Sequence, residues 1–445
     1  MAQIAYASRC LFTAVGVISY AVACKHAATM TAAAADRAHH RRRFSGRDPD
    51  EAHRAATPLE LLFDLTFVVA FGTAGNELAH YLADGDIRPG ILGFVFATFA
   101  VSWAWINYSW FASAYDTDDW VFRVATMVQM VGVIVLALGL QQAFASIARG
   151  DVLDNGVMVA GYVVMRVPMV FLWALAARDD PLRRPAALVY IWTISVAQVF
   201  WVALAIIDLP IEVTFAIALV LIAIETSGPY IAERYRGGTP WHARHIAERY
   251  GLLVIITLGE GVLGTVASIN AVVHGSSGWT VNAAVVAIAG IGLTFGTWWT
   301  YFAIPWGDVL ELHRERSFLW GYGHMIVFGS LVAMGAGLHV AAYELEGKTK
   351  ISDTGTVLCT VIPVAIYIAS LYALYASFTH HTDPFHLSLI AGTALVLVLA
   401  IVLAAVGVSI AFCLIVVMWA PLVTVIGYET LGHRHLEDAF ARIRG

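Results

Sequence analysis

TPLELLFDLTFVVAFG, residues 57–72, opens the first of a series of long apolar stretches in this chain. It begins with Thr57 and Pro58, a typical N-cap and first-turn pair for a helix. Two acids, Glu60 and Asp64, follow at a spacing of four, which places both on one helical face. Because charge is costly inside a bilayer, acids in such a stretch are candidates for function. The stretch therefore predicts a membrane helix that carries two functional acids.

The composition indicates a membrane protein throughout its length. Hydrophobic residues make up 59% of the 445 residues and charged residues only 13%, whereas soluble domains have about 25% charged residues. The mean hydropathy is +0.73. Four cysteines without CxxC or paired spacing predict packing residues rather than a disulfide framework. These values exclude an ordinary soluble domain and predict a many-pass membrane protein with the lipid bilayer as its first partner.

The apolar stretches predict twelve membrane helices, each near the roughly 20 residues that a bilayer requires. Their expected ranges in the sequence are about 59–81, 90–113, 120–144, 156–176, 185–206, 211–232, 251–272, 281–303, 319–343, 354–377, 385–406 and 407–428. The predicted fold class is therefore an all-α, polytopic membrane helical bundle.

Basic residues predict which side of the membrane each loop faces. If the amino terminus is inside, the cytoplasmic segments hold 20 of the 26 Lys and Arg residues, and the outer loops hold only 4. This bias is a strong signal of orientation. It predicts that both termini lie in the cytoplasm.

The same reading divides the chain into five segments. Residues 1–56 are expected to form a basic, disordered cytoplasmic tail, with Met30 as an alternative start of translation and a short signal-like segment as another reading. Two six-helix units follow at 57–232 and 251–428, joined by a cytoplasmic linker at 233–250, and 429–445 form a second tail. The basic run HHRRR near the first span predicts orientation rather than nucleic-acid binding.

The two halves of the chain show a similar spacing of residues. Trp105 precedes Arg123 by 18 residues, and Trp298 precedes Arg316 by the same number. Glu60 in the first half has a counterpart in Glu248. Because six spans return the chain to the same side, such units would be parallel repeats. The spacing predicts a duplicated architecture.

Three charged residues lie deep in the predicted spans. Glu260 is about 14 Å from the start of its helix, Arg166 is equally deep, and Glu225 lies in the inner half of its span. Unpaired charge is costly at such depth, so we expect either Glu260 or Glu225 to pair with Arg166. Burial disfavours the charged form of a carboxyl, and such groups suit a proton relay or an ion site.

The acidic pair of the first span has an alternative, structural interpretation. Arg249 and Arg54 lie near the cytoplasmic ends of the helices, where they could neutralise Glu60, Asp64 or Glu248. We therefore weigh an inner-face ion-pair network against a functional site for this cluster.

Other patterns give no support for catalysis, cofactors or metals. Gly259–Gly264 match GxGxxG, but no strand precedes them, so a dinucleotide site is not expected. The glycines would instead allow close helix packing or a local unwinding around Glu260. Histidines at 380, 381, 386, 433 and 435 lack helical metal-ligand spacing. We predict a non-enzyme without cofactor or metal.

Two motifs together resemble a known family. TPLELLFDLTFVVAF and HIAERYGLLVIITLGEGVLGT are similar to the motifs of the bacterial low temperature requirement protein A family, and the resemblance covers roughly residues 54–430. It implies an integral inner-membrane protein linked to growth in the cold, without an established activity. The motif residues that it implies are Glu60, Asp64, His245, Glu248, Arg249 and Glu260. Gly261 stands where the family often has serine. Phe63 and Asp64 are faintly similar to a motif of two-repeat potassium channels.

Three functional hypotheses follow from these observations. The first is a secondary transporter of a small solute or ion, proton-coupled, with Glu260 and Arg166 together in a central site. The second is a cation channel formed in an oligomer, with the first helix lining the pore. The third is an intramembrane enzyme acting on lipid, or a membrane stress sensor. A homo-oligomer is left open.

Overall fold

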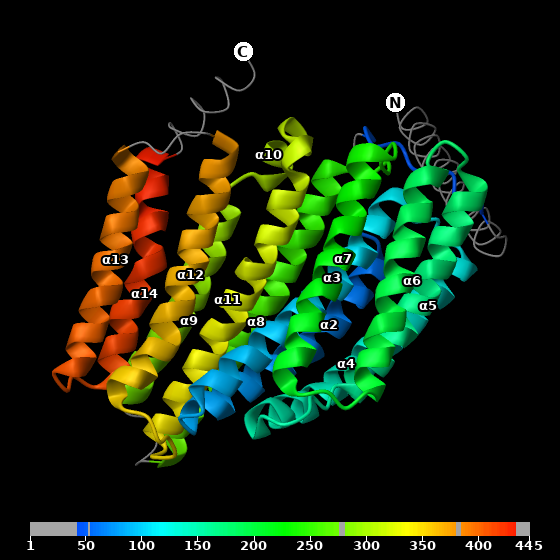
Figure 1. The fold of residues 1–445 in the computed structure, drawn as a ribbon. Coiled ribbons are helices and arrows are strands. Elements are labelled where there is room, and N and C mark those ends of the chain that lie inside the picture. The colour runs from blue at the N-terminus through cyan, green and yellow to red at the C-terminus, as the bar shows by residue number, and fades with distance from the viewer. Residues whose placement is uncertain (1–41, 52–53, 276–280, 380–383, 433–445) are drawn as a thin grey trace, which may run out of the picture.

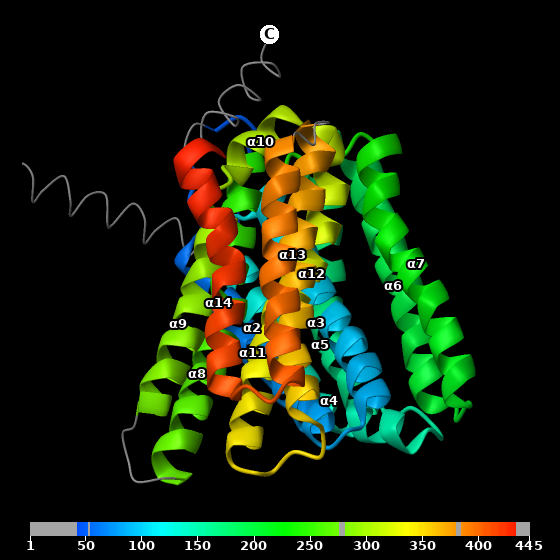
Figure 2. The same ribbon diagram turned by 90° about the vertical axis from the view of Figure 1, so that its left-hand side faces the viewer.

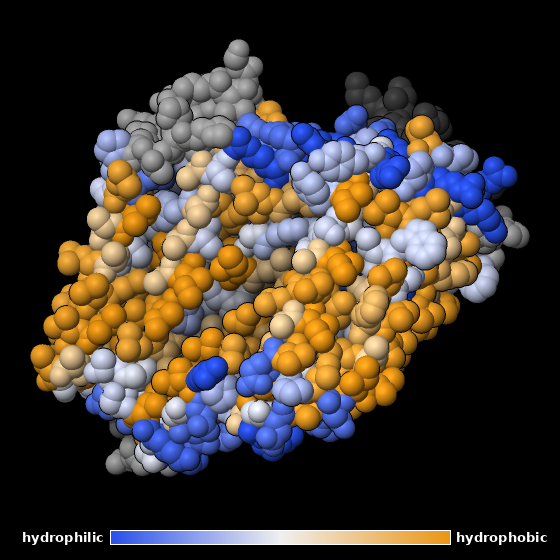
Figure 3. Space-filling model, viewed as in Figure 1, coloured by the Kyte–Doolittle hydropathy of each residue, from blue (hydrophilic) through white to orange (hydrophobic). Residues whose placement is uncertain are grey.

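The computed structural model describes residues 42–51, 54–275, 281–379 and 384–432, and these residues form an all-α membrane bundle. Twelve of its helices are long and apolar enough to cross a membrane, which confirms the predicted fold class and number of spans. Figure 3 shows a broad apolar band between two hydrophilic ends. Helices suit this environment because each one satisfies its own backbone hydrogen bonds in lipid.

The helices follow one another with short connections. The first six spans are α2 (Pro58–Ala83), α3 (Ile87–Tyr115), α4 (Trp120–Arg149), α5 (Gly156–Asp179), α6 (Arg184–Ile206) and α7 (Ile211–Tyr235). The remaining elements are α8 (Ala243–Gly275), α9 (Val281–Phe302), the short α10 (Trp306–Leu312), η1 (Arg314–Arg316), α11 (Ser317–Leu345), α12 (Asp353–Thr379), α13 (Pro384–Ala405), α14 (Ile410–Gly427) and η2 (Tyr428–Gly432).

Helices α2, α3, α8 and α11 form the centre of the bundle. Helix α11 packs against α8, α12, α2 and α3, and α2 also contacts α3, α4 and α8. Helices α5, α6 and α7 lie on one side of this centre, and α13 and α14 lie at the opposite edge (Figure 1). Figure 2 shows α6 and α7 standing to one side of the other helices. Among the twelve spans, α11 and α3 have the largest fraction of buried residues.

Local sequence sets the start and end of several helices. The hydroxyl of Thr57 accepts a hydrogen bond from the Glu60 backbone N–H, and the Glu60 carboxylate accepts one from the Thr57 N–H, a complete capping box. Gly85 and Gly407 have φ of +84°, a left-handed conformation that permits the tight turns before α3 and α14.

Residues 42–51 and 54–56 differ from the disordered tail predicted for 1–56. The Phe44 ring is fully buried and lies 6.4 Å from the Phe111 ring. The Arg54 guanidinium donates to the carbonyls of Ala112 (2.6 Å) and Ser113 at the end of α3. These carbonyls belong to the last turn of α3, and that of Ala112 also accepts from the Asp116 N–H. Arg54 therefore adds to the C-terminal cap of α3 and holds the segment in place. Residues 1–41 lie outside the described residues.

The predicted linker 233–250 is also largely helical in the structure. Helix α7 continues to Tyr235, and α8 begins at Ala243, eight residues before the expected start of the seventh span at 251. The early start brings His245 and Arg249 onto the same helix as Glu260. It therefore joins the polar end of α8 to its membrane-spanning part without a break.

Candidate functional site

The acidic pair of α2 forms a buried ion-pair cluster with α8. Arg249 Nη1 lies 2.8 Å from Glu60 Oε1, and its Nη2 and Nε lie 2.5 and 3.1 Å from the two oxygens of Asp64. The side chains of Arg249 and Glu60 are 0% exposed and that of Asp64 is 2% exposed. The structure thus shows an ion-pair network between the acids of α2 and Arg249, which we call the Arg249 cluster.

Further donors and rings complete the Arg249 cluster. The indole N–H of Trp105 donates to Asp64 at 2.7 Å, and His245 Nε2 lies 3.3 Å from Glu60. The guanidinium of Arg249 lies 5.6 Å from the Trp105 ring and 5.8 Å from the Tyr108 ring, within the range of a cation–π contact. Because both carboxylates already have several donors, this cluster mainly fixes α2 against α8.

Glu260 lies deeper in the bundle and is in a different environment. Its side chain is almost completely buried, with 3% of the residue exposed. Among the described residues it has no hydrogen bond or ion pair, and no charged side chain acts on its carboxyl. A carboxyl in such a place has a strong preference for taking up a proton or a cation.

Glycines on two neighbouring helices make room for Glu260. A Cβ atom added to Gly72 of α2 would lie 3.0 Å from Glu260 Oε1, and one added to Gly75 would lie 3.5 Å from Oε2. A Cβ on Gly335 of α11 would lie 2.5 Å from the Glu260 carbonyl carbon. The carboxyl therefore faces the bare backbone of α2 at the place where α2, α8 and α11 meet.

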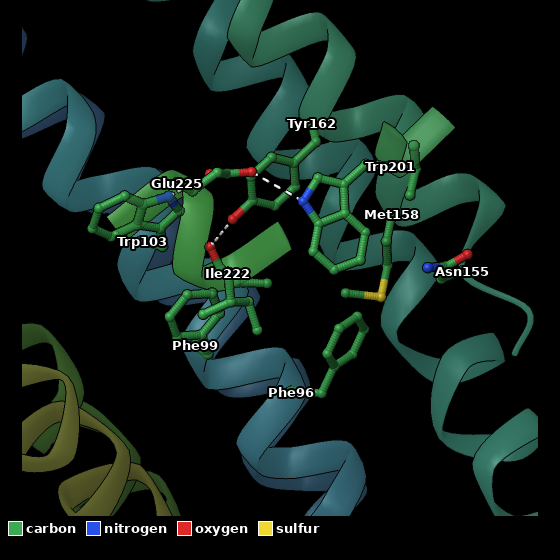
Figure 4. Close-up of a pocket in the computed structure, with 11 residues that line it drawn as sticks. Phe96, Phe99, Trp103, Asn155, Met158, Tyr162, Trp201, Ile222 and Glu225 are labelled. Atoms are coloured by element: carbon green, nitrogen blue, oxygen red, sulfur yellow. Dashed lines mark hydrogen bonds between the residues drawn. The ribbon is translucent and has the colours of Figure 1, made fainter. Parts of the chain in front are cut away.

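Arg166 and Glu225 form a second buried pair, between α5 and α7. Arg166 Nη2 lies 2.9 Å from Glu225 Oε2, and both side chains are at most 6% exposed. The indoles of Trp103 and Trp201 also donate to the Glu225 carboxylate, the latter at 3.0 Å. Figure 4 shows Glu225 between the two indoles at one end of a small aromatic pocket. The pocket has a volume of about 40 Å³, room for a few water molecules.

These contacts decide between the two pairings expected for Arg166. The pairing with Glu225 is present, and the pairing with Glu260 is absent from the structure. Helix α5 packs against α4 and α6, whereas α8 packs against α11, α9 and α2. Arg166 and Glu260 thus lie in different parts of the bundle, so the expectation of one shared central site is wrong.

Glu248, another motif residue, lies in a less enclosed position. Glu248 is exposed, and its carboxylate accepts a 3.4 Å hydrogen bond from the Ala56 backbone. Its predicted counterpart, Glu60, is buried, so the two acids have different environments. The proposed repeat itself stays a prediction.

Helix α8 is continuous through Glu260, without the local unwinding considered for its glycines.

The described part of the chain offers no cluster of metal ligands. Its residues contain no group of three or more His, Cys, Asp or Glu side chains that could hold a metal ion. His386 is described, whereas the other four histidines of the predicted cluster, at 380, 381, 433 and 435, lie outside the described residues.

Several residues that shape these sites were not singled out in the sequence. Trp103, Trp105 and Trp201 serve as indole donors to buried carboxylates, and Gly72 and Gly335 give Glu260 its space. Gly72 ends the opening motif, twelve residues beyond Glu60, but no spacing in the sequence marks it as a neighbour of Glu260. The tryptophans carry no signal either, because this residue type is common in membrane proteins in any case.

Comparison with known proteins now identifies the family. Residues 55–421 match the model of the bacterial low temperature requirement A protein, LtrA. The chain belongs to the LtrA family. It is also 26% identical over 298 residues to an uncharacterized protein of Rhizobium meliloti (strain 1021), an alignment that covers 62% of this chain and 67% of that protein. No solved structure matches the chain. The LtrA match confirms the resemblance inferred from the two motifs.

Proposed function

We propose that this LtrA-family protein is a proton-coupled secondary transporter of a small solute, with the Glu260 carboxyl as its proton-binding site. The observation that carries the proposal is the buried Glu260 carboxyl, which has no partner among the described residues and faces Gly72 and Gly75. Ionisable residues placed at this depth are typical of proton relays in transporters.

The Arg249 cluster would have a supporting role in this mechanism. Its three charged groups hold one another, so they are poorly suited to exchange a proton during transport. They lie on the same two helices as Glu260 and Gly72. Any movement of α2 against α8 that opens a path to Glu260 must therefore turn about, or break, this contact.

A feature of α2 favours transport over the cation channel. The exposed side chains of α2 include Leu61, Leu65 and Val69, each 45–59% exposed and all apolar. Such a face suits contact with lipid rather than the lining of a cation pore. The opposite face of α2 carries Glu60 and Asp64, which are closed off by Arg249.

Proteoliposomes that contain a pH-sensitive dye test the proposal. Pools of amino acids, sugars, organic cations and inorganic ions are added outside, and the internal pH is followed. We expect at least one pool to drive a proton flux with the wild type that is lost in Glu260→Gln.

The matched control is Glu248→Gln, the same substitution at an exposed position of the same helix. It should leave the flux unchanged. A solute-driven flux that persists in Glu260→Gln would refute the assigned role of Glu260, and an equal loss in both variants would show a general defect of α8.

A further inference from the structure

A large apolar groove lies on the lipid-facing side of the bundle, apart from Glu260. It has a volume of about 710 Å³ and is formed by α2, α3, α11 and α12. Its floor on α11 includes small residues such as Gly329, Ser330 and Ala333. Ala333 lines the groove, whereas Gly335, which packs against Glu260, is two positions further along α11. The two residues therefore point to nearly opposite faces of that helix. Figure 3 shows a hollow among apolar side chains on this face of the molecule.

The depth of the groove corresponds to one leaflet of a bilayer. Along α3 its lining extends from Ile87 to Phe99, a distance of about 18 Å at 1.5 Å per residue. Half of the hydrocarbon core is about 15 Å thick. At the deep end the Tyr322 hydroxyl donates to the Thr226 carbonyl at 2.9 Å, so this lining residue offers no free polar group there. The groove therefore suits a hydrocarbon chain.

The open end of the groove has a charged rim. Lys350 Nζ lies 3.2 Å from Asp84, and its backbone N–H donates to the Ala83 carbonyl, which ties the α11–α12 loop to the α2–α3 loop. Lys348 lies 2.6 Å from Glu346 in the same loop. These paired charges lie beside the lining residue Ile351.

Arg88 is the cation of the rim that remains available. It is exposed and forms no ion pair within the described part of the chain. It precedes Ile91 and Val95, which line the groove, by three and seven residues, so all three share a helical face. This side of the bundle has four Lys or Arg residues, and three of them (Arg88, Lys348 and Lys350) are at this rim.

We propose that the groove binds a phospholipid with a zwitterionic phosphoethanolamine headgroup. An acyl chain fills the groove, and the lipid phosphate accepts charge-assisted hydrogen bonds from Arg88. The headgroup ammonium lies near the carboxylates of the rim, Asp84, Asp86 and Glu346. With the exposed Asp353, which lies between the lining residues Ile351 and Gly355, the rim has four acids and three cations. A rim that carries both signs with a slight excess of acid suits a zwitterionic headgroup better than an anionic one.

Lipid retention by the full-length protein tests this site. The protein is purified in detergent, stripped of lipid, and incubated with mixed micelles that contain equal amounts of phosphatidylethanolamine, phosphatidylglycerol and diacylglycerol. Native mass spectrometry then counts each bound lipid. We expect phosphatidylethanolamine to exceed both other lipids.

Two pairs of variants separate the headgroup from the chain. Arg88→Ala should weaken phosphatidylethanolamine retention about tenfold, the effect of losing one charge-assisted hydrogen bond, whereas Arg149→Ala, on the same side of the bundle, should not. Ala333→Phe fills the groove and should abolish retention of all three lipids, whereas Ala216→Phe on the exposed face of α7 should leave retention unchanged.

Several results would overturn the proposal. These are equal retention of the three lipids by the wild type, preference for phosphatidylglycerol, an unchanged Arg88→Ala, or an Ala333→Phe that retains lipid like the wild type. Thermal unfolding of each variant in the same detergent shows whether it is folded. The outcome is independent of the proposed transport, because the lining of the groove includes neither Glu260 nor the glycines Gly72, Gly75 and Gly335 that face it.

Discussion

Arg249 on α8 and Asp64 on α2 form a two-bond ion pair, with nitrogen–oxygen distances of 2.5 and 3.1 Å, inside the helix bundle. The residues are 185 positions apart in the sequence, so the pair joins the first span of the chain to its seventh. Burial removes both groups from solvent, and each depends on the other for compensation of its charge.

Removal of Arg249 should therefore be strongly destabilising. Arg249→Met leaves Glu60 and Asp64 buried without their cation, at a cost of about 3–5 kcal/mol. Arg244→Met, at an exposed arginine on the same helix, should cost about 1 kcal/mol or less. Unfolding in detergent, followed by tryptophan fluorescence, measures both. Equal effects of the two substitutions would contradict the structural role of the Arg249 cluster.

Neutralising Glu60 and Asp64 in the Arg249→Met variant gives a second test of the Arg249 cluster. Adding Glu60→Gln and Asp64→Asn to Arg249→Met removes the uncompensated charge, so the triple variant should recover part of the lost stability. A triple variant less stable than Arg249→Met would show that shape, rather than charge, is what the cluster provides.

Close packing around Glu260 predicts a steric effect at Gly335. A Cβ there would lie 2.5 Å from the Glu260 carbonyl carbon, a backbone atom that cannot move away easily. Gly335→Ala should cost about 1–3 kcal/mol. Gly156→Ala, where an added Cβ meets nothing within 4 Å, is the control and should be neutral. If Gly335→Ala is equally neutral in the same unfolding assay, α8 and α11 do not approach as closely as described.

The pair formed by Arg166 and Glu225 should show energetic coupling. Arg166→Met and Glu225→Gln each leave one group without its partner, and the double variant removes both. A double-mutant cycle should give a coupling energy of about 0.5–3 kcal/mol. The exposed pair of Arg123 and Asp118 should give less than about 1 kcal/mol. Additive effects at Arg166 and Glu225 would argue against their contact.

Asp116, just beyond the end of α3, should make stability depend on pH. Burial and the nearby Glu60 carboxylate raise the pKa of Asp116 to about 7, and its Oδ2 has no hydrogen-bond partner among the described residues. An unfolded aspartate has a pKa of about 3.9. The contribution of Asp116 is therefore fully present below pH 4 and is lost as the pH rises through 7.

Asp116→Asn removes this dependence. At pH 8 the variant should be more stable than the wild type, by up to about 4 kcal/mol because each pKa unit corresponds to about 1.4 kcal/mol, and the difference should vanish near pH 4. Melting temperatures at pH 4, 6 and 8 measure the effect, with Asp151→Asn in an exposed loop as the control. A wild-type advantage at pH 8 would contradict the assigned environment.

The sequence predicted the number of spans better than it predicted which buried charges form pairs. Apolar length alone determines how many helices can cross a bilayer, so twelve spans could be inferred. Position along a helix follows from residue number, and Glu260 and Arg166 both prove to be buried. Which helix lies beside which depends on packing around the bundle axis. For that reason Arg166 could not be assigned to Glu225 rather than Glu260 in advance.

The sequence also did not predict the contacts that the segment before α2 makes with α3. Phe44 and Arg54 lie in a stretch whose composition is that of a solvated tail, yet one ring packs on α3 and one guanidinium caps it. A single apolar residue and a single cation are too weak a pattern to predict order. The role of Gly72 likewise appears only once α8 is placed against α2.

The most direct measurement of the central claim is infrared titration of the Glu260 carboxyl in the purified protein, since it requires no knowledge of the transported solute. Spectra of the wild type, Glu260→Gln and Glu248→Gln are compared as the pH is raised. We predict a protonated-carboxyl band that titrates in the wild type and in Glu248→Gln and is missing from Glu260→Gln. The same titrating bands in Glu260→Gln as in the wild type would contradict the assignment of Glu260 as the proton-binding site.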